Sequence, residues 1–234
     1  FCFFKKNKII SSIKINISKL CHDQLLLSFK KYKDQLNSLK VIISSVVPSK
    51  NKILEEFFLK YSMNIFYLNK IHKTFNLKTY IKNKKTIGDD RIVNILYAKE
   101  LYKKSIVVVD FGTATTFDVL NHLGFYSGGV ITPGINLSLE SLKSKTEKLP
   151  LVSFRKVDNV IGTSTKHAIQ SGFFWGYVSM VEGLINKINK EEKRTFKIIL
   201  TGGNSIFFKN IFKNVLTIDP FFTSKGLNFI LTEF

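Results

Sequence analysis

The chain has 234 residues, of which 44% are hydrophobic, and its 22 phenylalanines predict a large core rich in aromatic side chains. The formal net charge of +19 comes mainly from scattered lysines, since the only arginines are Arg91, Arg155 and Arg194. No dense basic tract lies beside aromatic residues that could stack on bases, so we expect no nucleic-acid partner. No apolar run approaches the roughly 20 residues of a membrane span, so we expect no membrane partner. Cys2 and Cys21 are too few for a disulfide framework, so we expect a cytoplasmic protein.

Strands and helices are predicted to alternate along most of the chain. Runs rich in β-branched residues predict strands at 1–4, 8–17, 40–47, 64–68, 106–109, 115–120, 197–200 and 215–218. Helical spacing and capping residues predict helices at 21–39, 53–61, 88–102, 135–148, 165–189, 206–210 and 223–231, with a lysine-rich loop at 71–85. We therefore expect an α/β fold in two domains, 1–104 and 105–234. The chain begins with Phe rather than Met, so we also expect residues upstream of it.

The stretch 106–133, IVVVDFGTATTFDVLNHLGFYSGGVITP, predicts a core strand that carries Asp110 to its end. Phe111, Gly112 and Thr113 then turn the chain, and backbone N–H groups in such a turn form a concavity that binds anions. A carboxylate would repel phosphate there by roughly 4 kcal/mol at about 4 Å and an effective dielectric near 20. A bound cation would reverse the sign, so the stretch predicts a nucleotide-phosphate site with a cation. The alternative is an ordinary hairpin in which the aspartate accepts hydrogen bonds from the turn.

A second candidate site is the predicted helix start at Gly88, Asp89, Asp90 and Arg91. Two carboxylates at a helix N-terminus have an ordinary explanation, because they interact favourably with the helix dipole. An arginine in the first turn is less expected. Together with unpaired N–H groups, these side chains could hold a small polar substrate.

Several motifs, taken in order, resemble those of type III pantothenate kinases over nearly the whole chain. They are ISSVVPS at 43–49, GDDRIVN at 88–94, VDFGTATTFDV at 109–119, GGVITPG at 128–134, KLPLV at 148–152, IGTST at 161–165, QSG at 170–172, YVSMVEG at 177–183 and TGG at 201–203. The resemblance implies two similar actin-like (ribonuclease H-like) halves that enclose ATP in a cleft. It also implies that the first strand and its phosphate loop precede residue 1.

The resemblance assigns a role to each matching residue. Pantothenate binding falls on Gly88, Asp89, Asp90 and Arg91, with Asp90 as the catalytic proton acceptor, and a further substrate contact falls on Thr165. ATP binding falls on Gly112 and Thr113, and the monovalent-cation ligand falls on Asp110. The family implies MgATP as the phosphoryl donor, potassium or ammonium as an activator, and a homodimer with the pantothenate site near its interface.

Two positions depart from the family pattern. Asp89 stands where the family usually has alanine, and Ile81, Lys82, Asn83 and Lys84 replace its Tyr-Asp-Asn-Pro, with Tyr80 one place early.

We expect phosphorylation of pantothenate to 4′-phosphopantothenate, the first step of coenzyme A biosynthesis. The alternatives are an accessory factor for transcription from the same family and a catalytically impaired structural subunit.

Overall fold

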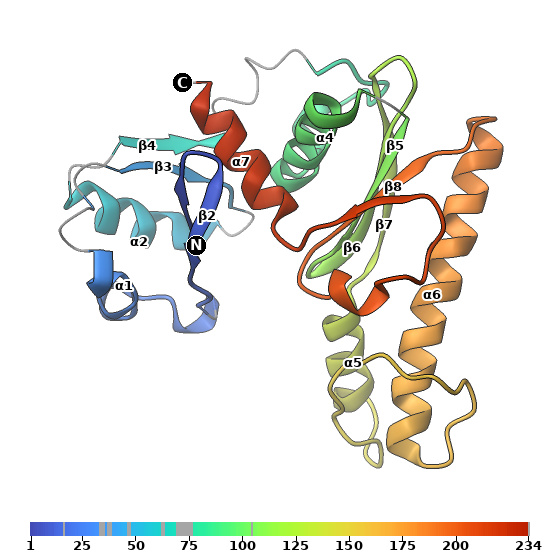
Figure 1. The fold of residues 1–234 in the computed structure, drawn as a ribbon. Helices are drawn as coiled ribbons and strands as arrows, with labels where there is room; N and C mark the ends of the chain where they lie inside the picture. Colours follow the sequence, from blue (N-terminus) through green and yellow to red (C-terminus); the bar gives the residue numbers. More distant parts are fainter. Residues whose placement is uncertain are drawn as a thin grey trace. The chain divides into compact units, whose positions relative to one another are not determined.

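A computed structural model describes residues 1–15, 17–32, 36, 39–45, 48–61, 64–68, 77–103 and 105–233 (Figure 1). The chain forms two compact units. Unit 1 comprises Phe1–Leu77, Asn83–Val93 and Ser224–Phe234, and unit 2 comprises Lys78–Lys82 and Asn94–Thr223. Helices α4 (Asp89–Tyr102) and α7 (Phe222–Thr232) each contribute residues to both units. The division into domains 1–104 and 105–234 stays a prediction, since these compact units divide within the two helices.

Unit 1 contains two small sheets. Strands β1 (Cys2–Lys5) and β2 (Lys8–Ser12) form an antiparallel hairpin, and β3 (Lys40–Ile43) pairs in parallel with β4 (Asn64–Tyr67). The helices described wholly within this unit are α1 (His22–Phe29) and α2 (Pro48–Leu59), with short 3-10 turns η1 (Ile17–Lys19) and η4 (Lys84–Thr86).

The core of unit 1 is aromatic, as the composition predicts. The Phe29 ring centroid lies 5.3 Å from Phe3, 5.5 Å from Phe57 and 5.7 Å from Phe58, and these rings are nearly or fully buried. Tilted and edge-to-face arrangements at such distances are the favoured geometries for aromatic pairs. Packing of phenylalanines therefore holds α1 and α2 to the β1–β2 hairpin.

Unit 2 is built on a five-stranded sheet in the order β7-β6-β5-β8-β9. Its strands are β5 (Ile106–Phe111), β6 (Ala114–Leu120), β7 (Tyr126–Pro133), β8 (Lys197–Thr201) and β9 (Val215–Ile218). The first three strands are antiparallel neighbours, whereas β5, β8 and β9 run parallel. Because helices accompany a central sheet with parallel and antiparallel strands, the predicted α/β fold class is confirmed.

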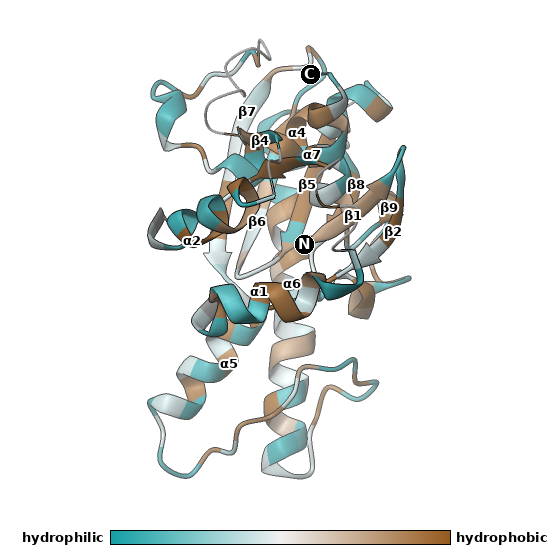
Figure 2. Cartoon of the chain, turned by 90° about the vertical axis from the view of Figure 1, so that its left-hand side faces the viewer, coloured by the Kyte–Doolittle hydropathy of each residue, from teal (hydrophilic) through white to brown (hydrophobic). Residues whose placement is uncertain are grey.

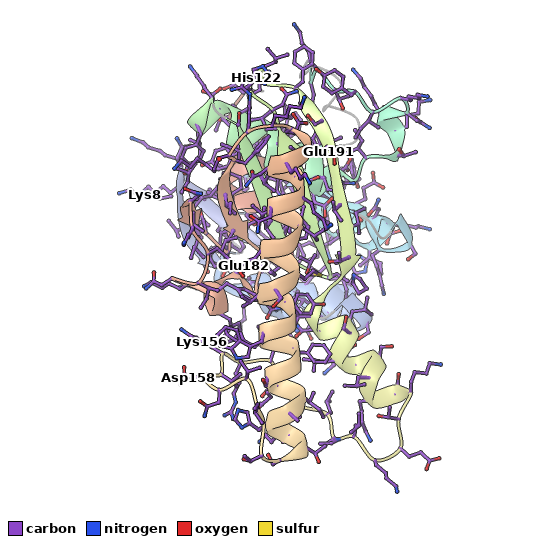
Figure 3. The ribbon with its side chains drawn as sticks, turned by 90° about the vertical axis from the view of Figure 1, so that its right-hand side faces the viewer. Lys8, His122, Lys156, Asp158, Glu182 and Glu191 are labelled. Atoms are coloured by element: carbon purple, nitrogen blue, oxygen red, sulfur yellow. The ribbon has the colours of Figure 1, made fainter. Side chains whose placement is uncertain are left out.

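One face of this sheet carries the larger hydrophobic core. Val107, Val109 and Phe111 of β5 pack with residues of α5 (Ile135–Ser144) and α6 (Thr165–Glu191), and Figure 2 shows how hydrophobic the central strands are. With 27 residues, α6 is about 40 Å long at 1.5 Å per residue. Its N-terminal half and α5 extend past the edge of the sheet, while Glu191 marks its other end (Figures 1 and 3).

Most predicted elements are confirmed, but several bounds differ. The strand predicted at 8–17 ends at Ser12, the helix predicted at 21–39 ends as an α-helix at Phe29, and α5 ends at Ser144 rather than 148. The helix predicted at 53–61 begins earlier, at Pro48, a residue whose fixed φ suits the first helical position. The segment predicted as a helix at 206–210 is the 3-10 turn η5 (Ser205–Phe208). Parts of the predictions for 8–17, 21–39, 40–47 and 71–85 lie outside the described residues.

Strand β7 was not predicted. Gly128 and Gly129 lie in its middle, and glycine lowers strand propensity because it has no side chain to pack. The strand forms because its partner β6 supplies an antiparallel ladder from Ala114 to Leu120, whose register shifts once, between Val119 and Leu120. Across the described ranges, no helix combines the length and apolarity needed to cross a membrane.

Candidate functional site

The first candidate site lies at the edge of the unit 2 sheet where β5 and β8 end. Half-buried Asp110 is the penultimate residue of β5, and exposed Gly112 and Thr113 turn the chain into β6. In open α/β sheets, ligands bind outside the carboxyl ends of the parallel strands. The structure therefore brings together three residues predicted to bind ATP and a cation, Asp110, Gly112 and Thr113, at an edge suited to a ligand.

A chain of hydrogen bonds holds the Asp110 carboxylate. Asn94 of α4 donates from Nδ2 to Oδ2 of Asp110 at 3.3 Å, and the Oγ1 of Thr223 lies 3.5 Å from the same oxygen. Thr223 also donates to Oδ1 of Asn94 at 2.8 Å. Asp110 thus has an oriented side chain rather than a freely rotating one.

Two glycines pack closely against the Asp110 turn. A Cβ on Gly134, at the start of α5, would overlap the Thr113 carbonyl oxygen and lie 2.8 Å from the carbonyl oxygen of Gly112. A Cβ on Gly202, after β8, would overlap Oδ1 of Asp110 and lie 2.7 Å from the carbonyl oxygen of Phe111. Gly202 also has a φ of +85°, which other residues rarely adopt. The turn therefore needs glycine on both sides.

Tyr177 of α6 holds the backbone next to Gly134 through a hydrogen bond to Pro133. Its hydroxyl donates to the carbonyl oxygen of Pro133 at 2.8 Å and lies 3.3 Å from Oγ of Ser138. Burial raises the pKa of Tyr177 above its ordinary value, and the hydrogen bond with Ser138 lowers it in part. The phenol stays protonated at neutral pH and keeps the Pro133–Gly134 junction in place.

The residues around Asp110 offer oxygen ligands suited to a monovalent cation. Thr201 pairs in register with Asp110, so both side chains point to the same face of the sheet. Thr201 is fully buried, and its Oγ1 has no hydrogen-bond partner within the described part of the chain. A single carboxylate with a hydroxyl suits a hard ion of one positive charge, such as potassium, which takes oxygen ligands in proteins. Among the described residues, no group of three or more His, Cys, Asp and Glu side chains gathers for a metal ion.

A buried carboxylate lies on the same face of the sheet. Asp118 of β6 is fully buried and accepts hydrogen bonds from the hydroxyl of Tyr126 at 2.6 Å and from Oγ1 of Thr116 at 3.2 Å. Because Thr116 is itself the β6 neighbour of Asp110, this network supports the strand that faces Asp110. Burial of a charged group is costly unless hydrogen bonds compensate, so we assign this network a structural role.

The second candidate site lies in unit 1 at the start of α4. Asp89, Asp90 and Arg91 are all half-buried, and Oδ1 of Asp90 accepts a hydrogen bond from the backbone N–H of Arg91 at 2.9 Å. A Cβ on Gly88 would lie 2.7 Å from that same oxygen. The structure therefore brings these four residues together at a helix N-terminus, where the dipole favours anionic groups.

Within unit 2, Thr165 lies at one end of α6. It is the exposed first residue of α6, and Ser164 caps the helix by accepting a hydrogen bond from the N–H of His167 at 3.2 Å. This end of α6 is the tip that extends past the sheet, alongside the segment that carries Lys156 and Asp158 (Figures 1 and 3). Within unit 2, Thr165 therefore does not lie with Asp110 at the edge of the sheet.

Sequence reasoning missed several residues that shape the Asp110 site. Gly134 and Gly202 belong to the GGVITPG and TGG motifs, so a signal was present, although their contacts with the turn were not expected. Thr201 ends β8 and is the first residue of the TGG motif, although its contact with the Asp110 site was not expected. Asn94 ends the GDDRIVN motif, although its contact with Asp110 was not expected. Thr223 carried no local signal, because it meets Asn94 and Asp110 only through contacts distant in sequence.

Comparisons with known proteins agree on one family. A family model described as Type III pantothenate kinase matches residues 1–187. A protein of Pelagibacter ubique (strain HTCC1062), named Type III pantothenate kinase, is 40% identical over 230 residues, which cover 95% of this chain and 89% of that protein. A protein of the same name from Desulforapulum autotrophicum is 38% identical over 208 residues, covering 88% of this chain and 79% of that protein.

A solved structure also shares the fold. It is described as a Baf family transcriptional activator from Campylobacter jejuni, with a TM-score of 0.57 over 86% of this chain and 87% of that one. At 22% identity, the TM-score supports a shared fold. The family assignment instead follows from the extended match to the family model and from relatives near 40% identity. The chain therefore belongs to the type III pantothenate kinase family.

Proposed function

We propose that this protein transfers the γ-phosphoryl group of ATP to the primary hydroxyl of pantothenate, giving 4′-phosphopantothenate at the first step of coenzyme A biosynthesis. The observation that carries the proposal is the Asp110 turn, which is enclosed by Gly134 and Gly202 in a chain whose relatives are named as this kinase. The transcription-factor alternative is not favoured, because three relatives at 37–40% identity carry the kinase name.

On the donor side, we propose that Gly112 and Thr113 contact the phosphates of MgATP. Mg²⁺ usually enters such sites with the nucleotide and keeps several of its waters, so it needs few protein ligands. Asp110 and Thr201 would hold a potassium or ammonium ion, which supplies positive charge beside the phosphates. The hydrogen bond from Asn94 to Asp110, with Thr223 donating in turn to Asn94, supports this role, since it orients the carboxylate before any ligand arrives.

On the acceptor side, we propose that Gly88, Asp89, Asp90 and Arg91 bind pantothenate. A guanidinium pairs well with a carboxylate, which pantothenate carries, so Arg91 is suited to hold that end of the substrate. Asp90 would orient the primary hydroxyl and take its proton late. Phosphoryl transfer passes through a loose transition state, and a carboxylate is a weak base toward an alcohol until the bond to phosphorus forms.

We also propose a homodimer, as the family resemblance implies. In it, Thr165, the exposed first residue of α6, would contact pantothenate in the site of the partner subunit. The segment between α5 and α6 also exposes apolar side chains, with Ile161 83%, Val160 64% and Leu151 63% exposed. Such a surface is suited to burial against a second copy of the chain.

We also propose a cytoplasmic location. Both cysteines are free thiols, in agreement with a reducing compartment.

The test is an assay of the full-length protein with ATP, pantothenate and potassium, followed by mass analysis of the product. We expect ADP release that depends on pantothenate, and a product heavier by one phosphoryl group. Asp90→Asn should lower turnover by roughly 10² to 10⁴ while leaving the circular dichroism spectrum unchanged. Asp110→Asn should weaken potassium activation and raise the ATP concentration needed for half-maximal rate. ADP release that is indifferent to pantothenate would refute the proposal.

If activity appears only after a second, different chain is added, the structural-subunit alternative holds instead. The same assay therefore separates the two hypotheses, provided that the purified protein is checked for co-purifying chains by mass spectrometry.

A further inference from the structure

The oxygen Oδ2 of Asp110 is held by two side chains that come from distant parts of the chain. Asn94 lies in α4 and Thr223 in the first turn of α7, and the contact between them spans 129 residues of sequence. Both belong with Asp110 to unit 2. Their hydrogen bonds therefore describe a single compact arrangement around the carboxylate.

The three side chains form a chain of donors, in which Thr223 donates to Asn94 and Asn94 donates to Asp110. The hydroxyl of Thr223 has one proton, and its distance to Oδ1 of Asn94 is 2.8 Å, compared with 3.5 Å to Oδ2 of Asp110. It therefore donates to Asn94. With Oδ1 of Asn94 occupied as an acceptor, Nδ2 faces Asp110 and donates at 3.3 Å. The opposite orientation of the amide would place two oxygen acceptors against each other, so Thr223 selects the productive one.

The other carboxylate oxygen of Asp110 lies toward the turn. A Cβ on Gly112 would lie 3.3 Å from Oδ1, and a Cβ on Gly202 would overlap it. Oδ2 is thus engaged by Asn94, while Oδ1 lies at the glycine-lined side. A carboxylate whose two oxygens have different surroundings presents one defined oxygen to a ligand.

Ordinary structural roles do not account for Asn94 and Thr223. Asparagine in the interior of a helix is unfavourable, yet Asn94 is fully buried in α4. The hydroxyl of Thr223 donates to Asn94 and so does not cap α7, and the turn that leads into the helix is formed by Asp219. The Oδ1 of Asp219 accepts from the N–H of Phe221 at 3.0 Å, and its carbonyl oxygen accepts from the N–H of Phe222 at 3.1 Å.

We infer that Asn94 and Thr223 are positioning residues, which hold the Asp110 carboxylate so that Oδ1 is presented to the activating monovalent cation. The inference rests on the proposed function and extends it, because it assigns the response to potassium to side chains that do not touch the ion. Thr223 acts through Asn94, and Asn94 acts through Asp110.

The test compares Thr223→Val with Thr223→Ser in the full-length protein. Valine keeps the shape of threonine without the hydroxyl, whereas serine keeps the hydroxyl. The readout is the melting temperature in potassium chloride minus that in choline chloride at the same ionic strength. A cation that binds the folded state raises the melting temperature by mass action, whereas a general loss of stability lowers both values and leaves their difference unchanged.

We expect Thr223→Val to reduce this potassium-specific shift and to raise the potassium concentration for half-maximal activity roughly tenfold, with the KM for pantothenate unchanged. Thr223→Ser should behave like the wild type. Asn94→Leu, which removes the direct donor, should have the larger effect. If Asn94→Leu does not fold, the two Thr223 variants suffice for the comparison.

Two outcomes would overturn the inference, and they differ from each other. If Asp110→Asn abolishes the potassium-specific shift while Thr223→Val and Asn94→Leu retain it, the cation assignment stands and the positioning role is wrong. If the wild type shows no potassium-specific shift, the proposed cation site itself fails and the inference fails with it.

Discussion

Gly202 lies so close to Asp110 that a Cβ at position 202 would overlap the carboxylate oxygen Oδ1. The same residue has a φ of +85°, so glycine is required by both space and backbone conformation. A Cβ on the neighbouring Gly203 would instead meet open space, with no other atom within 4 Å. The pair therefore offers a matched test of the Asp110 site.

Gly202→Ala is expected to displace the Asp110 carboxylate, which its new Cβ would overlap. Activity should fall at least about tenfold, because misplacing a charged group by a fraction of an ångström weakens the electrostatic stabilisation of the transition state. The left-handed backbone adds about 1–2 kcal/mol of strain for any residue with a Cβ. Gly203→Ala should retain activity and its response to potassium. Steady-state kinetics across a potassium titration makes the comparison, and equal effects of the two substitutions would contradict the contact.

Gly134→Ala is expected to push the Gly112–Thr113 turn away, since the new Cβ would overlap the Thr113 carbonyl oxygen. If this turn binds ATP phosphates, the KM for ATP should rise, by up to about 10²-fold for a displacement near 1 Å. Gly183→Ala in α6 is the control, because nothing lies within 4 Å of a Cβ there. That substitution should leave the KM unchanged and stabilise the helix slightly.

Tyr126→Phe is expected to destabilise the fold by roughly 1–3 kcal/mol, because it removes a 2.6 Å hydrogen bond to the fully buried Asp118 carboxylate. Tyr80→Phe is the control, since Tyr80 is 59% exposed and an exposed substitution usually changes stability by less than about 0.5 kcal/mol. Urea unfolding followed by circular dichroism measures both. A loss no larger than that of the control would show that Asp118 does not depend on this hydroxyl.

The raised pKa of Tyr177 predicts how stability changes in alkaline solution. Below pH 10 the phenol is protonated in both folded and unfolded chains, so it adds no pH dependence. Above pH 10 the unfolded chain releases the proton first, because burial keeps the folded-state pKa higher. The unfolding free energy therefore falls as pH rises through this range. Tyr177→Phe should make that fall shallower than in the wild type, as urea titrations of both proteins from pH 9 to 11 would show.

Mixing two inactive variants tests whether Thr165 serves the partner subunit. If each site combines Asp90 of one subunit with the partner's Thr165, random mixing of Asp90→Asn and Thr165→Val subunits leaves half of the heterodimer sites intact. Activity should then return to roughly a quarter of the wild-type rate. If both residues serve the same subunit, every site carries one substitution and mixing restores nothing. Sedimentation analysis of each variant confirms that the dimer is retained.

Much of the architecture was predictable because its signals are local. Four consecutive β-branched residues specify β5 as a buried strand, and the cap before Thr165 with an apolar stripe specifies α6. The motifs also located the two groups of candidate residues, at 88–91 and 110–113. Strand β7 escaped prediction because its glycines suppress local propensity, and only pairing with β6 makes it a strand.

By itself, the amino-acid sequence determined the fold class, the family and which carboxylates are candidates for chemistry. Only the tertiary structure decided how Asp110 is oriented, because Asn94 and Thr223 reach it from 16 and 113 residues away. It likewise decided that Gly134 and Gly202 must lack side chains. Periodicity and capping act over a few neighbouring residues, whereas hydrogen bonds and close contacts depend on which distant segments the folded chain brings together.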